Sequence, residues 1–443
     1  GDIGYKHAAP ALLTLAQSEN VTPAVVQAAL KALAAIQIDA DSNLSTQQTV
    51  VAGRFFEGQD SVIPTSIAGI NNFWVWDDMY GLETRDVPSA VFDDVMAMYY
   101  AAAALATDPQ NESAMSIFVA SNLRRDRELS GEEDIVYGNL AYSPEFYATV
   151  FGPEVASDVL RIALQRGDTP LAHDAIAALG RTAGATAVLT GSEQPLVKAM
   201  FYPDRRVQYE SAMTIASTLP TIYFDDSYRV VPLLASAVRS GDSKYAIIVS
   251  ESSSARSRIS TSLELMGWSI MGEGTTAQSA VEAAGMIPGI DLVVVDASSA
   301  EYAQNVAATL AMLPQTTVTP VLLLSGGVEA QILREATETQ DMVAAGDSAI
   351  SDIALAAVLE GLLSKAAGGS LDYDEAEVFA ARALAVLRDI ALADTVLEVE
   401  DATGALIDAL TNAKPESQVV IAETLAMINN KRAQRALINA ALN

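Results

Sequence analysis

The chain has 443 residues, enough for roughly two to four domains, and half of them are hydrophobic. Acidic residues outnumber basic ones by 56 to 26, and the net charge of −30 argues against nucleic acid or an anionic membrane and favours a basic protein partner. The chain has no cysteine and only two histidines, His7 and His173, which excludes disulfides and cysteine nucleophiles and leaves no material for a multi-histidine metal site.

Residues 1–150 are predicted to be mainly helical. Residues 9–37 contain two helical stretches, and Thr22 is the expected N-cap of the second, with Pro23 at its first helical position. No apolar run reaches the ~18 residues of a membrane-spanning helix, so the alanine-rich residues 97–106 predict a packed helix. The start of the chain is not a signal peptide, and we expect a targeting segment to have been removed ahead of Gly1.

An aromatic segment interrupts these helices. Residues 72–77 alternate in polarity, which predicts a strand or an extended segment. We expect Trp74 and Trp76 to pack against a helix. The alternative is an exposed pair that stacks on a carbohydrate or another ligand, as in an extracytoplasmic binding protein. Further on, residues 104–111 resemble the inter-repeat turn of tetratricopeptide repeats, which implies a helix-turn-helix.

Small and apolar residues recur at the same offsets in four places: residues 25–33, 171–179, 207–215 and 421–425. Small side chains let two helices approach closely, and stacked helical pairs build a solenoid. With residues 168–171 and 204–207 as turns, the pattern resembles HEAT repeats, and residues 201–207 resemble HEAT-repeat proteins of planctomycete-type bacteria. The resemblance covers residues 9–37 in the helical region 1–150 as well as the segments 151–240 and 368–443, and it implies a helical protein-binding scaffold.

Residues 241–367 differ, because short Val- and Ile-rich runs alternate with helical stretches. This alternation predicts βαβ units and a parallel sheet, hence an inserted α/β flavodoxin-like domain in a mainly helical chain. The predicted strands are residues 245–250, 268–272, 291–296, 318–324 and 341–345. The predicted helices are residues 253–266, 275–284, 300–312, 328–338 and 348–365. A flexible joint is expected at residues 366–372, followed by a long helix whose first-turn acids favour capping over a metal site.

The α/β segment resembles the receiver domain of response regulators. The residues that carry the resemblance lie in 249–256, 291–296 and 319–325. By position, Asp296 matches the aspartate that accepts a phosphoryl group and Ser325 the assisting hydroxyl. The acidic pair that would hold Mg²⁺ falls on Ser250 and Glu251, so one acid is missing.

Two further receiver positions have changed. The lysine that follows the fifth strand in the family falls on Ala345 or Gly346, and the aromatic switch position on Met342. Without the lysine, an aspartyl phosphate at Asp296 would face uncompensated charge. The resemblance therefore implies a degenerate receiver without metal or cofactor.

We interpret the chain as a non-enzymatic protein-binding scaffold with an embedded degenerate receiver. One alternative is a signalling protein phosphorylated at Asp296; another is an extracytoplasmic carbohydrate- or ligand-binding protein that uses Trp74 and Trp76. A glycine-rich phosphate loop followed by lysine is absent from the sequence. The localisation stays open, because the lack of cysteine slightly favours export whereas a receiver favours the cytoplasm.

Overall fold

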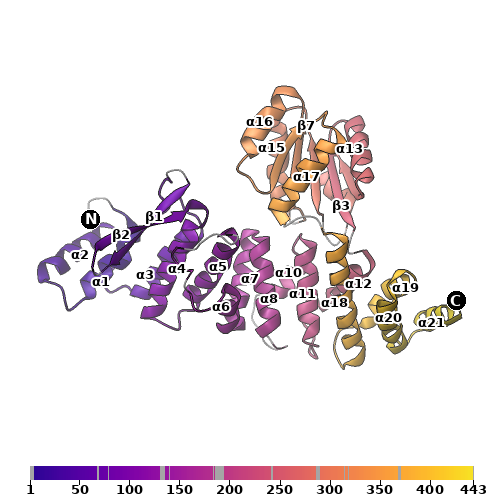
Figure 1. Cartoon of the computed structure of the whole chain (residues 1–443), viewed down its shortest axis with the longest axis horizontal. Helices are drawn as coiled ribbons and strands as arrows, with labels where there is room; N and C mark the ends of the chain where they lie inside the picture. Colours follow the sequence, from indigo (N-terminus) through magenta and orange to yellow (C-terminus); the bar gives the residue numbers. More distant parts are fainter. Residues whose placement is uncertain are drawn as a thin grey trace. The chain divides into compact units, whose positions relative to one another are not determined.

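The computed structural model describes residues 4–66, 69–77, 79–129, 135–138, 140–182, 184, 194–240, 243–285, 290–313, 315–317, 319–367 and 371–442. The chain forms two compact units, Gly1–Arg161 and Ile162–Asn443, and the boundary falls inside helix α7 (Pro153–Arg166). The described part is mostly helical, with one β-hairpin and one parallel sheet (Figure 1). Residue 318 of the predicted fourth strand and residues 368–370 of the predicted joint lie outside the described residues.

The first unit contains helices and the hairpin. Its elements before α7 are η1 (Lys6–Ala8), α1 (Ala9–Gln17), α2 (Pro23–Ala35), α3 (Leu44–Phe56), β1 (Ile70–Asp77), β2 (Gly81–Pro88), α4 (Ser89–Thr107), α5 (Glu112–Leu129) and α6 (Pro144–Val150). The two helices predicted between residues 9 and 37 are therefore confirmed. Thr22 takes the N-cap position of α2 with extended backbone angles, but its side chain makes no capping hydrogen bond.

Helices α3, α4 and α5 pack together and form the core of the first unit. Ala52, Met98, Ala101 and Phe118 meet in one buried cluster. The alanine-rich residues 97–106 lie within α4, so the predicted packed helix is confirmed, and α4 and α5 form the predicted helix-turn-helix. None of the helices in the described ranges is long and apolar enough to cross a membrane.

The hairpin pairs β1 and β2 antiparallel, from Ile70 opposite Pro88 to Asp77 opposite Gly81. Gly81 has a φ of +84°, a backbone conformation that favours glycine. The base of the hairpin packs on α4, where the rings of Phe73 and Tyr99 meet edge to face with centroids 5.6 Å apart. The extended segment was predicted, but its partner β2 was not, because β2 is mostly polar.

The second unit combines helices with an α/β module. The helical elements after α7 are α8 (Thr169–Thr182), α10 (Pro195–Ala199), α11 (Arg205–Ser217), η2 (Ser227–Arg229), α12 (Val230–Ser240), α18 (Tyr373–Leu392), η3 (Val399–Ala402), α19 (Thr403–Asn412), α20 (Pro415–Met427) and α21 (Lys431–Leu442). The α/β module contains β3 (Lys244–Ser250), α13 (Ser253–Leu265), β4 (Trp268–Gly274), α14 (Ala277–Ala284), β5 (Leu292–Asp296), α15 (Ala300–Met312), β6 (Val321–Ser325), α16 (Gly327–Thr337), β7 (Val343–Asp347) and α17 (Asp352–Ala367).

The five strands of the module form one parallel sheet in the order β4-β3-β5-β6-β7. Numbered from the first strand of the module, this is the doubly wound order 2-1-3-4-5. Helices α13 and α17 cover one face and α14, α15 and α16 the other, because alternate strand residues such as Ile248 and Val249 enter opposite cores. The predicted five-stranded parallel sheet is confirmed.

Two glycines allow α14 to lie unusually close to β4. A Cβ atom on Gly272 would stand 2.3 Å from the carbonyl oxygen of Ala280, and one on Gly274 would stand 2.4 Å from the Ala280 nitrogen. Because backbone atoms cannot yield as a flexible side chain can, both positions require glycine. These glycines therefore serve helix–strand packing.

The helical part of the second unit continues across the inserted module. Helices α12 and α18 pack against each other although the whole α/β module separates them in sequence, and α18 also contacts α11 and α20. The predicted core residues of the helical pairs are buried as expected: Leu171, Ile176, Leu179, Val207 and Ile215. The module is thus inserted between the two helices of one pair.

The turns between these helices are capped by aspartates at the predicted positions. The carboxylate of Asp168 accepts the N–H of Leu171 at 3.1 Å, and that of Asp204 accepts the N–H of Val207 at 3.1 Å. Asp372 likewise caps α18, which confirms the capping interpretation of the acids at its start. These hydrogen bonds satisfy N–H groups that a helix leaves unpaired in its first turn.

Candidate functional site

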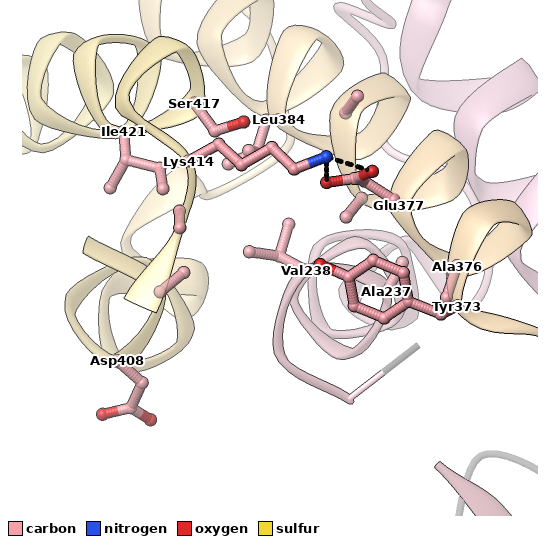
Figure 2. A pocket seen from close by; sticks show the side chains of 14 residues that line it. Ala237, Val238, Tyr373, Ala376, Glu377, Leu384, Asp408, Lys414, Ser417 and Ile421 are labelled. Carbon is pink, nitrogen blue, oxygen red and sulfur yellow. Dashed lines mark hydrogen bonds and ion pairs between the residues drawn. The ribbon is translucent and has the colours of Figure 1, made fainter. Parts of the chain in front are cut away.

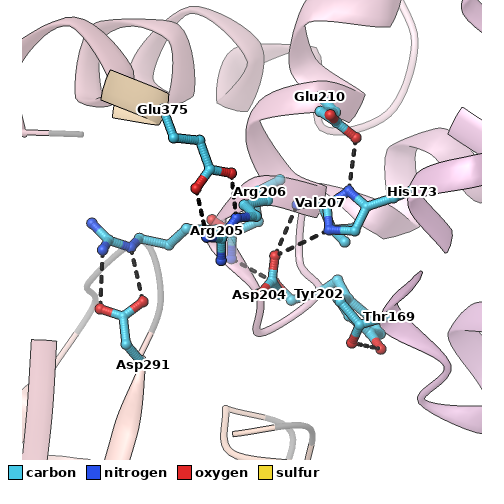
Figure 3. A network of polar contacts seen from close by, with 11 residues as sticks. Thr169, His173, Tyr202, Asp204, Arg205, Arg206, Val207, Glu210, Asp291 and Glu375 are labelled. Atoms are coloured by element: carbon cyan, nitrogen blue, oxygen red, sulfur yellow. Dashed lines mark hydrogen bonds and ion pairs between the residues drawn. The ribbon is translucent and has the colours of Figure 1, made fainter. Parts of the chain in front are cut away.

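The buried Arg205 holds the base of the α/β module on the helices (Figure 3). Arg205 of α11 donates from Nε and Nη2 to the two carboxylate oxygens of Asp291, at 3.2 and 3.0 Å. Its guanidinium also lies over the ring of Tyr245, 4.8 Å from the centroid, and donates to the carbonyl of Ser243. Because Asp291 directly precedes β5, this contact anchors the end of the sheet where its strands begin.

A second ion pair in the same network joins α11 to α18. Arg206 donates from Nε and Nη2 to the carboxylate oxygens of Glu375 at 2.5 and 2.6 Å. His173 of α8 lies nearby, with Nδ1 2.8 Å from Glu210 and Nε2 3.8 Å from Asp204. Burial disfavours charge on His173, but the hydrogen bond and charge of Glu210, together with Asp204, raise its pKa above the ordinary value. His173 therefore belongs to the structural network.

The candidate phosphoryl site lies at the opposite, carboxyl end of the strands. Asp296 is the last residue of β5 and pairs in register with Ser250, the last residue of β3. Its side chain is only 12% exposed. Open α/β sheets place their ligand sites at this edge, so Asp296 has the expected location.

The carboxylate of Asp296 is engaged by groups of the protein itself. Ser348 donates from Oγ to Oδ1 at 2.7 Å, and Ser250 donates from Oγ to Oδ2 at 3.3 Å. Arg258 of α13 brings Nη2 to 3.9 Å from Oδ1. The cation beside Asp296 is therefore an arginine from a helix and not a lysine that follows the fifth strand. The uncompensated charge expected for an aspartyl phosphate stays a prediction.

The structure also changes which residue follows the fifth strand, where the receiver family has its lysine. Strand β7 runs from Val343 to Asp347 rather than from 341 to 345, so Ala345 and Gly346 lie inside it, opposite Leu323 and Leu324. The side chain that reaches Asp296 after this strand is that of Ser348. The sequence did not reveal this shift, because the small residues of β7 give a weak strand signal.

The other predicted site residues are not joined to Asp296 by hydrogen bonds. Ser325, at the end of β6, is fully buried and donates from Oγ to the carbonyl of Ala297 at 2.8 Å. Glu251 follows β3 and its side chain is exposed. Within the described residues, no group of three or more His, Cys, Asp or Glu side chains could hold a metal ion.

The two tryptophans of the hairpin contradict the packing expectation. Trp74 is 57% exposed and Trp76 is 73% exposed, whereas Phe73, which precedes them in β1, is buried. The alternating polarity of residues 72–77 correctly predicted an extended segment. The face that packs on α4, however, is the one that carries Phe73 and not the one that carries the tryptophans. The tryptophan face is therefore available to a ligand.

Two grooves open between helices of the second unit. The first, with a volume of about 460 Å³, lies between α12, α18, α19 and α20, and the Glu377–Lys414 ion pair stands in its wall (Figure 2). The second, about 720 Å³, lies between α8, α11 and α18, with Thr214, Met213 and Ala385 among its lining residues. Both are lined largely by small or apolar side chains, which a peptide could contact closely.

Comparisons with known proteins add no relative: no family model, no curated protein and no solved structure matches this chain.

Proposed function

We propose that this chain is a non-enzymatic protein-binding scaffold built on HEAT-like helical repeats, with a receiver-like module that no longer transfers phosphoryl groups. The observation that carries the proposal is the continuity of packed helices through α11, α18 and α20, with a groove on each side of α18. Stacked helical pairs of this kind present extended surfaces on which other proteins bind.

The surroundings of Asp296 support a silent module. Phosphoryl transfer to an aspartate requires an accessible carboxylate, a bound Mg²⁺ and a cation that stabilises the transferred group. Here both carboxylate oxygens accept hydrogen bonds from serines, and the side chain is mostly buried. The competing proposal, a signalling protein phosphorylated at Asp296, would have to use Arg258 as its cation.

The scaffold proposal can be tested by site-specific photo-crosslinking from the grooves. A photoreactive residue at Ser417 samples the first groove and one at Thr214 the second, while the exposed Glu264 on α13 serves as the control position. We expect a protein adduct from at least one groove and none from the control. The crosslinked protein is then purified and its affinity for the uncrosslinked chain is measured.

Variants that block each groove test whether the crosslinked partner binds there. Ser417→Arg and Thr214→Arg place a bulky charge in each groove, and the variant in the occupied groove should weaken binding of the purified partner at least tenfold. If the partner binds both variants as tightly as the parent chain, or crosslinks equally from position 264, the grooves are not its binding surface and the proposal fails.

A further inference from the structure

One face of the β1–β2 hairpin exposes a group of large apolar side chains. Strand residues two apart share a face, so Trp74 and Trp76 project together, and Leu82, opposite Trp76 in register, adds to them with 61% exposure. Met79 and Tyr80 extend the surface at the turn, where they are 80% and 74% exposed. We call these five residues the hairpin face.

The opposite side of the hairpin holds this face in place. Phe73 and Val87 are buried, and Phe73 packs edge to face on Tyr99 of α4. The backbone of Met79 and Tyr80 is held as well, because Oδ1 of Asp77 accepts their N–H groups at 2.8 and 2.9 Å. A ligand would therefore meet a preorganised surface and would not have to order it.

The charges around the hairpin face favour a cationic ligand. Asp86 lies on the same face as Trp74, because Trp74 pairs with Thr84 and Asp86 stands two residues further along β2. Glu83 and the one arginine of the strands, Arg85, both lie on the other face, opposite Val75 and Phe73, and Arg85 donates to the carbonyl of Ile135 at 3.4 Å. Indole rings next to carboxylates attract ammonium and guanidinium groups, and the net charge of −30 steers basic partners towards the chain.

We propose that the hairpin face binds a basic, extended segment of a partner protein. Lysine or arginine side chains of the segment lie over the rings of Trp74 and Trp76 and close to Asp86, while its apolar side chains pack on Leu82 and Met79. This inference rests on the proposed function, that the chain binds a protein, and it names the chemistry of the partner.

The probe is an octapeptide of alternating lysine and valine, acetylated and amidated to remove its terminal charges. Binding should shift the emission of Trp74 and Trp76 to shorter wavelength, while the third tryptophan, Trp268, is buried and supplies a constant background. Titration calorimetry gives the affinity, which should fall as salt is added. Trp76→Ala should lower the affinity at least about 30-fold, the loss expected of an aromatic hot spot.

Matched controls separate this site from general attraction to an acidic chain. Tyr223→Ala removes an aromatic side chain that is 74% exposed in the second unit and should leave the affinity unchanged. Circular dichroism should match between the parent and both variants, since both side chains lie at the surface. The charge-reversed peptide of alternating glutamate and valine should not bind.

Several results would overturn the inference: no binding, equal binding of the glutamate peptide, or an affinity that Trp76→Ala leaves unchanged. An emission shift with cellotetraose or with phosphatidylcholine vesicles, but not with the lysine peptide, would overturn it too. The scaffold proposal is tested independently of this inference. If a partner protein recovered by crosslinking from a groove binds the Trp76→Ala chain as tightly as the parent chain, the hairpin inference is refuted and the scaffold proposal stands.

Discussion

Removal of the Asp291 carboxylate should loosen the α/β module from the helices beneath it. Arg205 has a side chain that is 3% exposed, so Asp291→Ala leaves a buried guanidinium without its counter-ion. The substitution also removes the acceptor of the Tyr245 N–H, which now donates to Asp291 at 2.7 Å. Breaking one half of a buried ion pair typically costs about 3–5 kcal/mol, and we expect a loss of that size here.

The double variant Arg205→Met with Asp291→Ala tests the reason for this loss. It removes the stranded charge together with its partner, so it should be more stable than Asp291→Ala alone. Glu423→Ala, which breaks an ion pair between two half-exposed side chains, is the matched control and should change stability little.

Fluorescence of Trp268 on β4 reports unfolding of the module when Trp74 and Trp76 are replaced by phenylalanine in every variant. Denaturant titration then gives the free energy of unfolding, and hydrogen exchange of α11 and β3 shows whether the contact itself opens. If Asp291→Ala unfolds at the denaturant concentration of the parent, the ion pair does not anchor the module. A double variant less stable than Asp291→Ala would refute the argument from buried charge.

Three further predictions concern packing, pH and phosphorylation. Gly272→Ala should cost about 1–3 kcal/mol because its methyl group meets the backbone of α14, whereas Gly361→Ala, with nothing within 4 Å in α17, should be neutral or stabilising in the same denaturant titration. The pKa of His173 is raised in the folded chain, so its stabilisation is complete below about pH 6.5 and is lost as pH rises through the raised value; His173→Gln should lower the melting temperature more at about pH 6 than at about pH 9. Incubation with acetyl phosphate and Mg²⁺ should leave the intact mass unchanged, and a phosphate-sized gain that Asp296→Ala abolishes would favour the signalling alternative.

The features predicted correctly from the sequence depend on local chemistry. Apolar runs of five or so residues bounded by helical stretches identified the sheet, because strands buried on both faces exclude polar residues. Residues 204–207 were placed correctly in a turn between helices and Asp372 at a helix start, since a carboxylate there accepts N–H groups only a few residues away. The spacing of small and apolar residues likewise located buried positions such as Leu179.

The errors concern contacts between residues distant in sequence. Both strand faces of residues 72–77 carry aromatic side chains, so the alternation could not tell whether Phe73 or the tryptophans would meet α4. The polar residues of β2 have little strand preference of their own, so nothing in the sequence indicated this strand. It is extended because it pairs with β1. Strand β7 was displaced by two residues for a related reason: its register follows from pairing with β6.

The sequence by itself therefore determined the helices of the repeats, the capping of α18 and the order along the chain of the five strands of the parallel sheet. It determined neither strand β2 nor the bounds of β7. Only the tertiary structure decided that α12 and α18 pair across the inserted module, and that Ser348, Ser250 and Arg258 meet at Asp296. The physical reason is range. Helix and strand preferences act over a few residues, whereas the surroundings of a carboxylate are set by packing among segments that the chain brings together from far apart.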